Sequence, residues 1–358
     1  MPGLGFFRHC SHSRQLEAAA GSGVEKARPR APEHGVHPAD QHEAESPTCI
    51  FTPDDVRERL RARPVLWFFV LAYAVTWLLW APMVIAGVPA FSETRHVPSW
   101  YALPGVAVGV TGTAFFMTAV TQGRAGVRRL LERLTCWRTE RRWYLVALLV
   151  IPLGELLITA ALVDRGVLRA LTPAALALYP AAFAAHFVFG PLFEETGWRG
   201  FALPRMQQQM GPMRATLLLG LLWGGWHFVL YLPAWISAGA AGIADAAIFV
   251  CFTVSVSVLF TWLSNNTRAS LLLAMLLHGS VNGTATYLLV LADRGVITPE
   301  AALFSAGVGT LLTAVLAAVV IAAITHRRLS YPRYRYEAEH FDLENAQGEK
   351  ETGATTGN

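Results

Sequence analysis

The chain has 358 residues, of which 53% are hydrophobic and only 15% are charged, and its formal net charge is +4. This composition, with its long apolar runs, is typical of an integral membrane protein rather than a water-soluble one. The four cysteines are scattered without a C-x-x-C pair, so neither a disulfide framework nor a thiolate zinc site is indicated.

Residues 1–56 differ in composition from the apolar middle of the chain, because they are rich in proline, histidine, glycine and charged residues. Such segments cannot bury enough apolar surface to fold. Residues 1–56 also contain no apolar run long enough for the central region of a secretory signal peptide. We therefore predict a disordered N-terminal tail over residues 1–56 and a polar C-terminal tail over residues 331–358.

Between the tails, apolar stretches recur eight times, each of about 20 residues, the length of helix that crosses a bilayer. Glycine and proline within them are tolerated because neighbouring groups in a membrane bundle re-satisfy the backbone. The sequence thus predicts an all-α, polytopic membrane protein in which residues 57–330 form about eight transmembrane helices. The predicted spans are 65–88, 101–121, 143–163, 173–193, 213–235, 243–263, 270–291 and 301–325.

The basic residues of the connecting loops are distributed unequally. When alternate loops are assigned to opposite sides, 19 basic residues fall on one side and four on the other, namely Arg95, Arg165, Arg169 and Arg294. Cytoplasmic loops of membrane proteins carry an excess of Lys and Arg. We therefore expect a multi-pass protein of the plasma membrane with both termini in the cytoplasm. The arginine-rich loop 123–142, with an apolar stripe at helical spacing, is interpreted as an interfacial helix that anchors the chain without a binding role.

Three short clusters of ionisable and amide residues interrupt the apolar segments. They read EETGWR at 194–199, WGGWH at 223–227 and HGSVN at 278–282. An ionisable group at membrane depth costs at least about 2.5 kcal/mol to insert, and it usually faces a bundle interior or a water-filled cavity. The three clusters therefore predict one buried polar site. His186 is a lone polar residue of the fourth span and is assigned no role.

In the first cluster, Glu195 and Arg199 are four residues apart with the acid N-terminal, which places them on one helical face in the favourable order for an ion pair. Glu194 points about 100° away from that pair. One carboxylate is thus available for chemistry while the other is tied to Arg199. The alternative is that both acids are interfacial charges at the end of the fourth span.

The other two clusters each contain a histidine with a partner one helical turn away. His227 follows Trp223 on the same face, and His278 shares a face with Asn282. The imidazole and the amide of the third cluster could both donate hydrogen bonds to one developing oxyanion, or the imidazole could bind a metal. Each histidine taken alone could equally be a packing residue or part of interhelical hydrogen bonding. Glycine pairs at 220/224 and 279/283 would let neighbouring helices approach closely.

The ordered set E-E-x-x-x-R, aromatic-x-x-x-H and H-x-x-x-N resembles the motifs of the CAAX prenyl endopeptidase and bacteriocin-processing (CPBP, or Abi) family of intramembrane proteases. The resemblance covers residues 172–291. One departure is Trp223, because the second motif of the family usually has phenylalanine at that position. Both residues are aromatic, so we expect the wall of the site to be kept and its pocket to change slightly.

The resemblance implies an intramembrane endopeptidase that hydrolyses a peptide bond of a membrane-associated peptide or protein. Its partners would be membrane lipid and that substrate, with no nucleic acid. It implies that Glu194 is a general base that activates water and that Glu195 and Arg199 are its supporting pair. It also implies that His227 makes a second contact to the water and that His278 and Asn282 stabilise the oxyanion.

Members of the family are commonly called metalloproteases, but the sequence has no H-E-x-x-H motif. A glutamate-dependent mechanism without metal fits the residues equally well, so the cofactor stays open. If a divalent metal such as zinc were bound, its ligands would be Glu194, His227 and His278.

Two other classes of function remain as alternatives. The same family could include a non-catalytic membrane protein that confers immunity or scaffolds an assembly. A proton-coupled transporter would also use buried Glu and His residues. Against transport, no inverted repeat is detectable, and the polar residues concentrate in one half of the chain rather than in matched positions of two halves.

Overall fold

The computed structural model describes residues 53–88 and 100–336, which form helices and connecting loops without a β-strand. Six of the helical segments are long and apolar enough to cross a membrane, or eight segments if each of two bent pairs counts as one span. The chain is therefore an all-α, multi-pass membrane protein, as the sequence predicted.

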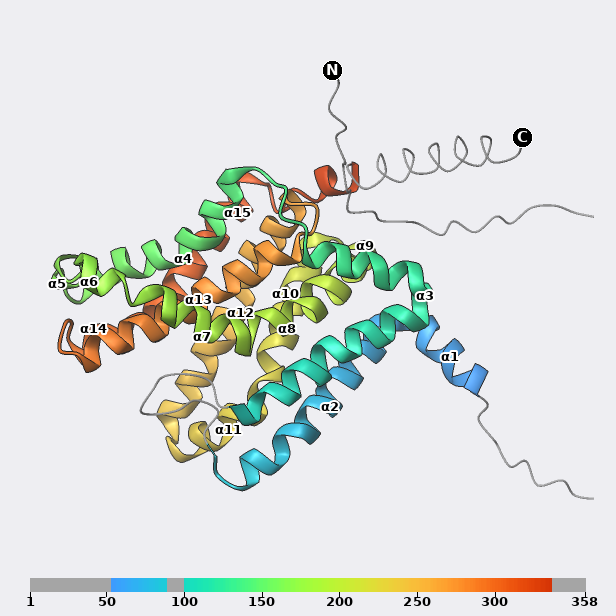
Figure 1. Ribbon diagram of the computed structural model, residues 1–358, viewed down its shortest axis with the longest axis horizontal. Helices are drawn as coiled ribbons and strands as arrows, with labels where there is room; N and C mark the ends of the chain where they lie inside the picture. Colours follow the sequence, from blue (N-terminus) through green and yellow to red (C-terminus); the bar gives the residue numbers. More distant parts are fainter. Residues whose placement is uncertain (1–52, 89–99, 337–358) are drawn as a thin grey trace, which may run out of the picture.

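Within residues 100–336 the helices are joined by short connections (Figure 1). In chain order the α-helices are α1 (Pro53–Ala62), α2 (Pro64–Ile85), α3 (Thr113–Leu134), α4 (Arg141–Leu162), α5 (Gly166–Arg169), α6 (Pro173–Leu176), α7 (Tyr179–Phe189), α8 (Pro191–Glu195), α9 (Leu203–Met210), α10 (Pro212–Trp226), α11 (Phe228–Ser237), α12 (Ala240–Asn266), α13 (Leu271–Asp293), α14 (Pro299–Phe304) and α15 (Thr310–Ile324). Between them lie the 3₁₀ turn η1 (Trp100–Ala102) and the π-helical segments η2 (Gly105–Gly112), η3 (Thr196–Ala202) and η4 (Ser305–Gly309).

Helix α13 runs through the middle of the bundle, with α4, α7, α8 and α12 packed around it (Figure 1). In its most apolar stretch 72% of the residues are buried, whereas the other unbroken candidate spans bury 28–44%. A helix enclosed on all sides can carry polar residues only if they find partners in the protein. The third polar cluster lies on this helix.

Two of the predicted spans are bent, and the sequence did not predict the bends. Pro173–Phe189 meets Pro191–Met210 at 46°, and Pro212–Trp226 meets Phe228–Ser237 at 64°. The first break is due to Pro191, which cannot continue a helix from the preceding turn, whereas the second lies at His227 after the weak helix formers Gly224 and Gly225. Irregular backbone at membrane depth is tolerated where it is buried in protein or lines a cavity.

The predicted close approach of helices occurs at both glycine pairs. A Cβ atom on Gly220 of α10 would lie 2.6 Å from the Cα atom of Val254 in α12. A Cβ atom on Gly283 of α13 would lie 2.9 Å from the Cα atom of Phe183 in α7. Only glycine permits these backbones to approach so closely, and the two contacts pack α10 against α12 and α13 against α7.

The arginine-rich loop is helical only up to Leu134, because α3 continues into it after a kink at Gly123, where φ is 65°, whereas residues 135–140 are not helical. One of its arginines does more than anchor the chain. The buried Arg133 donates hydrogen bonds to the backbone oxygens of Ala269 at 3.0 Å and of Gly200 and Arg199 at 2.9 Å each. The loop therefore also holds the backbone of the first polar cluster in place.

The predicted tails fall mostly outside the described residues. Residues 53–56, the last four of the N-terminal tail, belong to α1, and residues 331–336 form a further helical turn. The disorder of residues 1–52 stays a prediction.

We expect cysteine-accessibility mapping in a cysteine-free background to place the basic loops in the cytoplasm. Single cysteines at the exposed positions Arg138 and Arg333 should react only from the cytoplasmic side, and those at Arg165 and Asp293 only from outside. Arg333 lies 4.0 Å from Glu140, so the C-terminal turn and the α3–α4 loop occupy the same end of the bundle. Labelling of Arg138 and Arg333 from opposite sides, or an odd number of crossings, would overturn this topology.

Candidate active site

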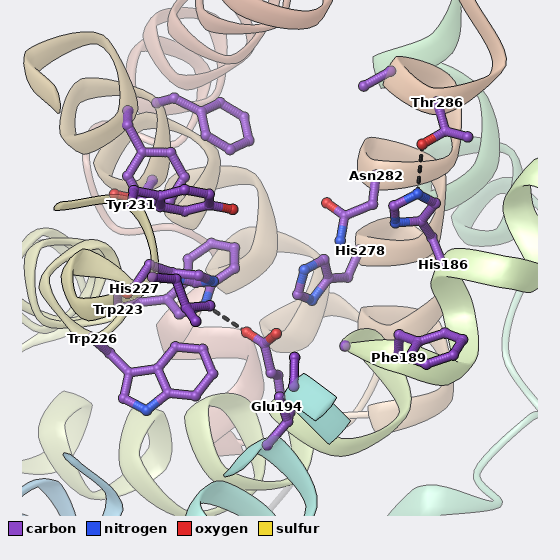
Figure 2. A pocket seen from close by; sticks show the side chains of 18 of the residues that line it. His186, Phe189, Glu194, Trp223, Trp226, His227, Tyr231, His278, Asn282 and Thr286 are labelled. Atoms are coloured by element: carbon purple, nitrogen blue, oxygen red, sulfur yellow. Dashed lines mark hydrogen bonds between the residues drawn. The ribbon is translucent and has the colours of Figure 1, made fainter. Parts of the chain in front are cut away.

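The three polar clusters converge on one cavity of about 380 Å³, which is walled by residues from α7, α8, α10, α11, α12 and α13 and by others from α2 and its neighbours. Glu194, His227, His278 and Asn282 all line it (Figure 2). Gly190 and His227, at the two helix breaks, are part of the wall, so the irregular backbone faces a cavity. The convergence predicted from sequence is thus confirmed, although Glu195 and Arg199 lie behind the wall.

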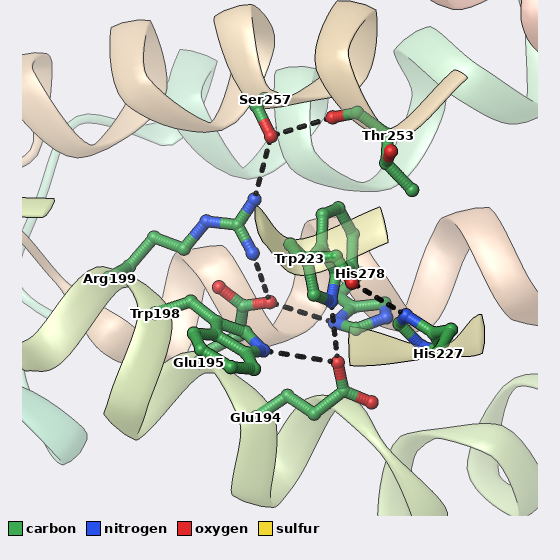
Figure 3. Close-up of polar contacts among 9 residues, drawn as sticks. All are labelled: Glu194, Glu195, Trp198, Arg199, Trp223, His227, Thr253, Ser257 and His278. Atoms are coloured by element: carbon green, nitrogen blue, oxygen red, sulfur yellow. Dashed lines mark hydrogen bonds and ion pairs between the residues drawn. The ribbon is translucent and has the colours of Figure 1, made fainter. Parts of the chain in front are cut away.

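Glu194 is 5% exposed, and one of its carboxylate oxygens is held by two indoles (Figure 3). Its Oε2 atom accepts hydrogen bonds from Nε1 of Trp223 at 2.8 Å and from Nε1 of Trp198 at 3.4 Å. Its Oε1 atom would lie 3.0 Å from a Cβ on Gly190, and Nδ2 of Asn282 would lie 3.9 Å from the same point. Glycine at position 190 therefore leaves open the space between the Glu194 carboxylate and the Asn282 amide.

Trp223 forms part of the aromatic wall, as expected, and it also donates a hydrogen bond to Glu194. A phenylalanine at this position, as is usual in the CPBP family, has no polar atom and could not donate to Glu194. The indole N–H at 2.8 Å fixes one carboxylate oxygen and so orients the other. Trp198 lies four residues after Glu194, so its contact with Glu194 could have been predicted from helical spacing. The contact of Trp223 with Glu194 joins two different helices, and no spacing predicts it.

The predicted ion pair between Glu195 and Arg199 is present and fully buried. Nη1 of Arg199 lies 3.0 Å from Oε1 of Glu195, and Nη2 donates to the hydroxyl oxygen of Ser257 at 3.4 Å. The guanidinium carbon also lies 3.9 Å from the ring centre of Phe260 and 4.5 Å from that of Trp223. No pattern in the sequence pointed to Ser257 and Phe260, which come from α12.

Glu195 also contacts His278, which the sequence did not predict. Nδ1 of His278 lies 2.8 Å from Oε1 of Glu195 (Figure 3). An ionised carboxylate only accepts hydrogen bonds, so Nδ1 carries the proton and Nε2 is the ring nitrogen left for a substrate. The rings of Trp223 and Phe260 pack against the imidazole in T-shaped contacts, with centroid distances of 5.3 and 5.9 Å. Glu195 thereby orients His278 in addition to pairing with Arg199.

His227 lies at the break between α10 and α11 rather than in the middle of a straight span. Its Nδ1 atom is 2.9 Å from the backbone oxygen of Trp223, so this nitrogen donates and Nε2 of the neutral ring is an acceptor. The ring stacks on Tyr231, with centroids 6.1 Å apart and planes inclined by 16°. An oriented acceptor beside a buried carboxylate is suited to hold a water molecule.

The candidate metal ligands do not form a ready metal centre. Among residues 53–88 and 100–336, no three His, Cys, Asp or Glu side chains are grouped so that they could hold a metal ion. Glu194 and His227 each have one polar atom engaged with Trp223, and His278 has one engaged with Glu195. Each of the three side chains keeps one further polar atom, namely Oε1 of Glu194 and Nε2 of each histidine, so their role as metal ligands stays a prediction.

Comparison with known proteins identifies the segment that carries the site. Residues 175–284 match the family model described as type II CAAX prenyl endopeptidase Rce1-like. CAAX prenyl protease 2 of Methanococcus maripaludis is 28% identical over 110 residues, which cover 29% of this chain and 40% of that protein. The chain thus matches less than half the length of this curated relative. All six candidate residues lie within the matched segment. This segment, which carries the site, is thus similar to the Rce1-like CAAX prenyl endopeptidases.

Proposed function

We propose that the protein is an intramembrane endopeptidase that hydrolyses a peptide bond of a membrane-associated peptide or protein. The observation that carries this proposal is the presence of Glu194, His227, His278 and Asn282 in the wall of one cavity inside an apolar bundle. A base, a water-holding acceptor and donors for an oxyanion are the groups that peptide hydrolysis needs.

In the first step, Glu194 acts as the general base. A water molecule held by Oε1 of Glu194 and Nε2 of His227 gives a proton to the carboxylate, and its oxygen attacks the carbonyl carbon of the peptide. The electron pair of the carbonyl double bond moves to the carbonyl oxygen. Glu195 is less suited to this step because Arg199 and His278 occupy the same oxygen and the carboxylate lies behind the cavity wall.

The carbonyl oxygen of the tetrahedral intermediate is negatively charged, and the amide N–H of Asn282 and Nε2–H of His278 donate to it. His278 can donate from Nε2 only when both ring nitrogens are protonated, since Nδ1–H already donates to Glu195. In that state, the positive charges of Arg199 and His278 balance the negative charges of the Glu195 carboxylate and the carbonyl oxygen, since Glu194 has taken up the proton of the water. A cluster without net charge suits the interior of a membrane bundle.

In the last step, the protonated Glu194 gives its proton to the nitrogen of the leaving amine. The carbon–nitrogen bond breaks as the carbonyl double bond reforms, which yields a carboxylic acid and a free amine. Glu194 returns to its starting state, so one residue serves first as base and then as acid.

The proposal is tested by comparing the termini of membrane peptides from cells that carry the native chain with those from cells that carry Glu194→Ala. We expect uncleaved precursors to accumulate in the variant cells and the new termini produced by cleavage to disappear. Identical sets of termini would overturn the proposal in favour of a non-catalytic scaffold.

A further inference from the structure

A second pocket, here called the side pocket, adjoins the catalytic cavity. Its volume is about 470 Å³, and its wall comes from α11, α12, α13, α14, η4 and α15. The two spaces share five wall residues, namely Tyr231, Phe249, Phe252, Asn282 and Ala285. Tyr231 and Asn282 lie on opposite sides of the catalytic cavity (Figure 2). Because Asn282 holds the carbonyl oxygen in the proposed mechanism, one flank of a bound peptide lies within reach of the side pocket.

The side pocket carries a single formal charge, which belongs to Asp245. The other wall residues are mainly apolar, and no lysine or arginine is among them. Asp245 is exposed, and its carboxylate forms no hydrogen bond or ion pair with the part of the chain that the structure describes. A groove of one charge sign with apolar walls concentrates groups of the opposite charge. The side pocket is therefore suited to a positively charged occupant.

Asp245 lies at the end of the side pocket that is farther from the catalytic residues. Along α12 it precedes Phe249 by four residues and Phe252 by seven. The two phenylalanines line both spaces, whereas Asp245 lines the side pocket alone. Seven residues of α-helix span about 10 Å, which is also the length of about three residues of extended peptide. The carboxylate is thus within reach of a side chain close to the cleaved bond.

Lysine and arginine match this pocket in shape as well as in charge. Both have an apolar stem, which can lie against Ile248 and Phe249, and a charged head that can stay in contact with water. Since Asp245 is itself exposed, an ion pair there avoids the desolvation cost of a fully buried pair.

We propose that the side pocket is a substrate subsite in which Asp245 binds a lysine or arginine side chain within about three residues of the cleaved bond. This inference rests on the proposed peptidase function and adds a preference for substrates that are basic near the cleaved bond.

The test uses the purified full-length protein in detergent and synthetic peptides in which one position at a time carries lysine, norleucine or glutamate. Norleucine keeps the stem of lysine without its charge. At one position near the cleaved bond, we expect kcat/KM to be about tenfold higher for lysine than for norleucine, mainly through a lower KM. The glutamate peptide should be cleaved least well, because its charge repels Asp245.

Two variants of Asp245 separate charge recognition from a structural role. Asp245→Asn should remove the preference for lysine and leave kcat/KM of the norleucine peptide unchanged. Asp245→Lys should reverse the order, so that the glutamate peptide becomes the best substrate. Glu300→Lys makes the same change of charge at an exposed acid that lines neither space, so it is the matched control and should keep the preference. A structural role would affect all three peptides equally.

The precursors that accumulate in Glu194→Ala cells give a second readout. Each should carry a lysine or arginine within about three residues of its cleaved bond, and the same precursors should accumulate in Asp245→Lys cells. Precursors without such a residue would overturn this inference.

Peptide cleavage without a preference for lysine at any position, or a preference that Asp245→Lys leaves unchanged, would also overturn this inference and leave the peptidase function standing. Inhibition by added phosphatidylethanolamine that disappears in Asp245→Asn, without any peptide preference, would assign the pocket to a lipid headgroup instead. If the protein cleaves no peptide and no precursor accumulates in Glu194→Ala cells, the proposed function fails and this inference fails with it.

Discussion

Replacing Glu194 with glutamine is expected to lower kcat for peptide cleavage by about 10²–10⁴-fold, the usual contribution of a general base, without loss of thermal stability. Glutamine cannot take the proton of the attacking water. Its side-chain oxygen can still accept the hydrogen bonds that Trp223 and Trp198 donate to Glu194. Because the substitution also removes a buried charge, the melting temperature in detergent should be unchanged or higher.

The measurement is a cleavage assay beside a melting curve, with the exposed Glu300→Gln as the matched control. His227→Ala should also abolish cleavage, and the double variant should lose little more than either single one, because residues that act on the same water are not additive. Full activity of either single variant would refute the assigned roles of these two residues.

Replacing Glu195 with glutamine is expected to destabilise the protein by about 3–5 kcal/mol, the usual cost of removing one partner from a buried ion pair. Arg199 is 1% exposed, and Glu195 is its ion-pair partner. Without the carboxylate, the guanidinium stays buried between Phe260 and Trp223 with no counter-charge in contact. His278 would also lose the charged acceptor of its Nδ1 proton.

Unfolding in denaturant, monitored in detergent, measures this loss. The double variant Glu195→Gln with Arg199→Met should recover part of the stability, since it removes the uncompensated charge as well. Activity should not return in the double variant, because His278 remains without its carboxylate. If Glu195→Gln instead kept full stability while Glu194→Gln melted much earlier, the two carboxylates would have been assigned the wrong way round.

Hydropathy located the membrane segments but not their shape. Hydropathy averaged over about 20 residues measures whether a segment can lie in lipid. The average does not depend on the backbone dihedral angles, so it does not reveal a bend. The bend at Gly190–Pro191 could have been suspected from the proline, whereas the larger bend at His227 has no proline at its position. Both bends matter for the site, since they turn α8 and α11 into the cavity wall.

The sequence by itself determined the relations that lie within one helix. His278 and Asn282 share one face of α13 because the rise and rotation of an α-helix are the same in every protein. Glu195 pairs with Arg199 as the four-residue spacing predicted, although Arg199 lies in the π-helical segment η3. The identities of the buried ionisable residues also predicted a shared site, since membrane insertion leaves such groups few places to lie.

Only the tertiary structure decided the contacts between helices. The hydrogen bond from Trp223 to Glu194, the contact of Glu195 with His278 and the pairing of His186 with Thr286 each join side chains from different helices. Such contacts depend on how far each helix is rotated about its axis and how deep it lies beside its neighbour. Side-chain packing over the whole interface sets both quantities, and no local spacing in the sequence records them.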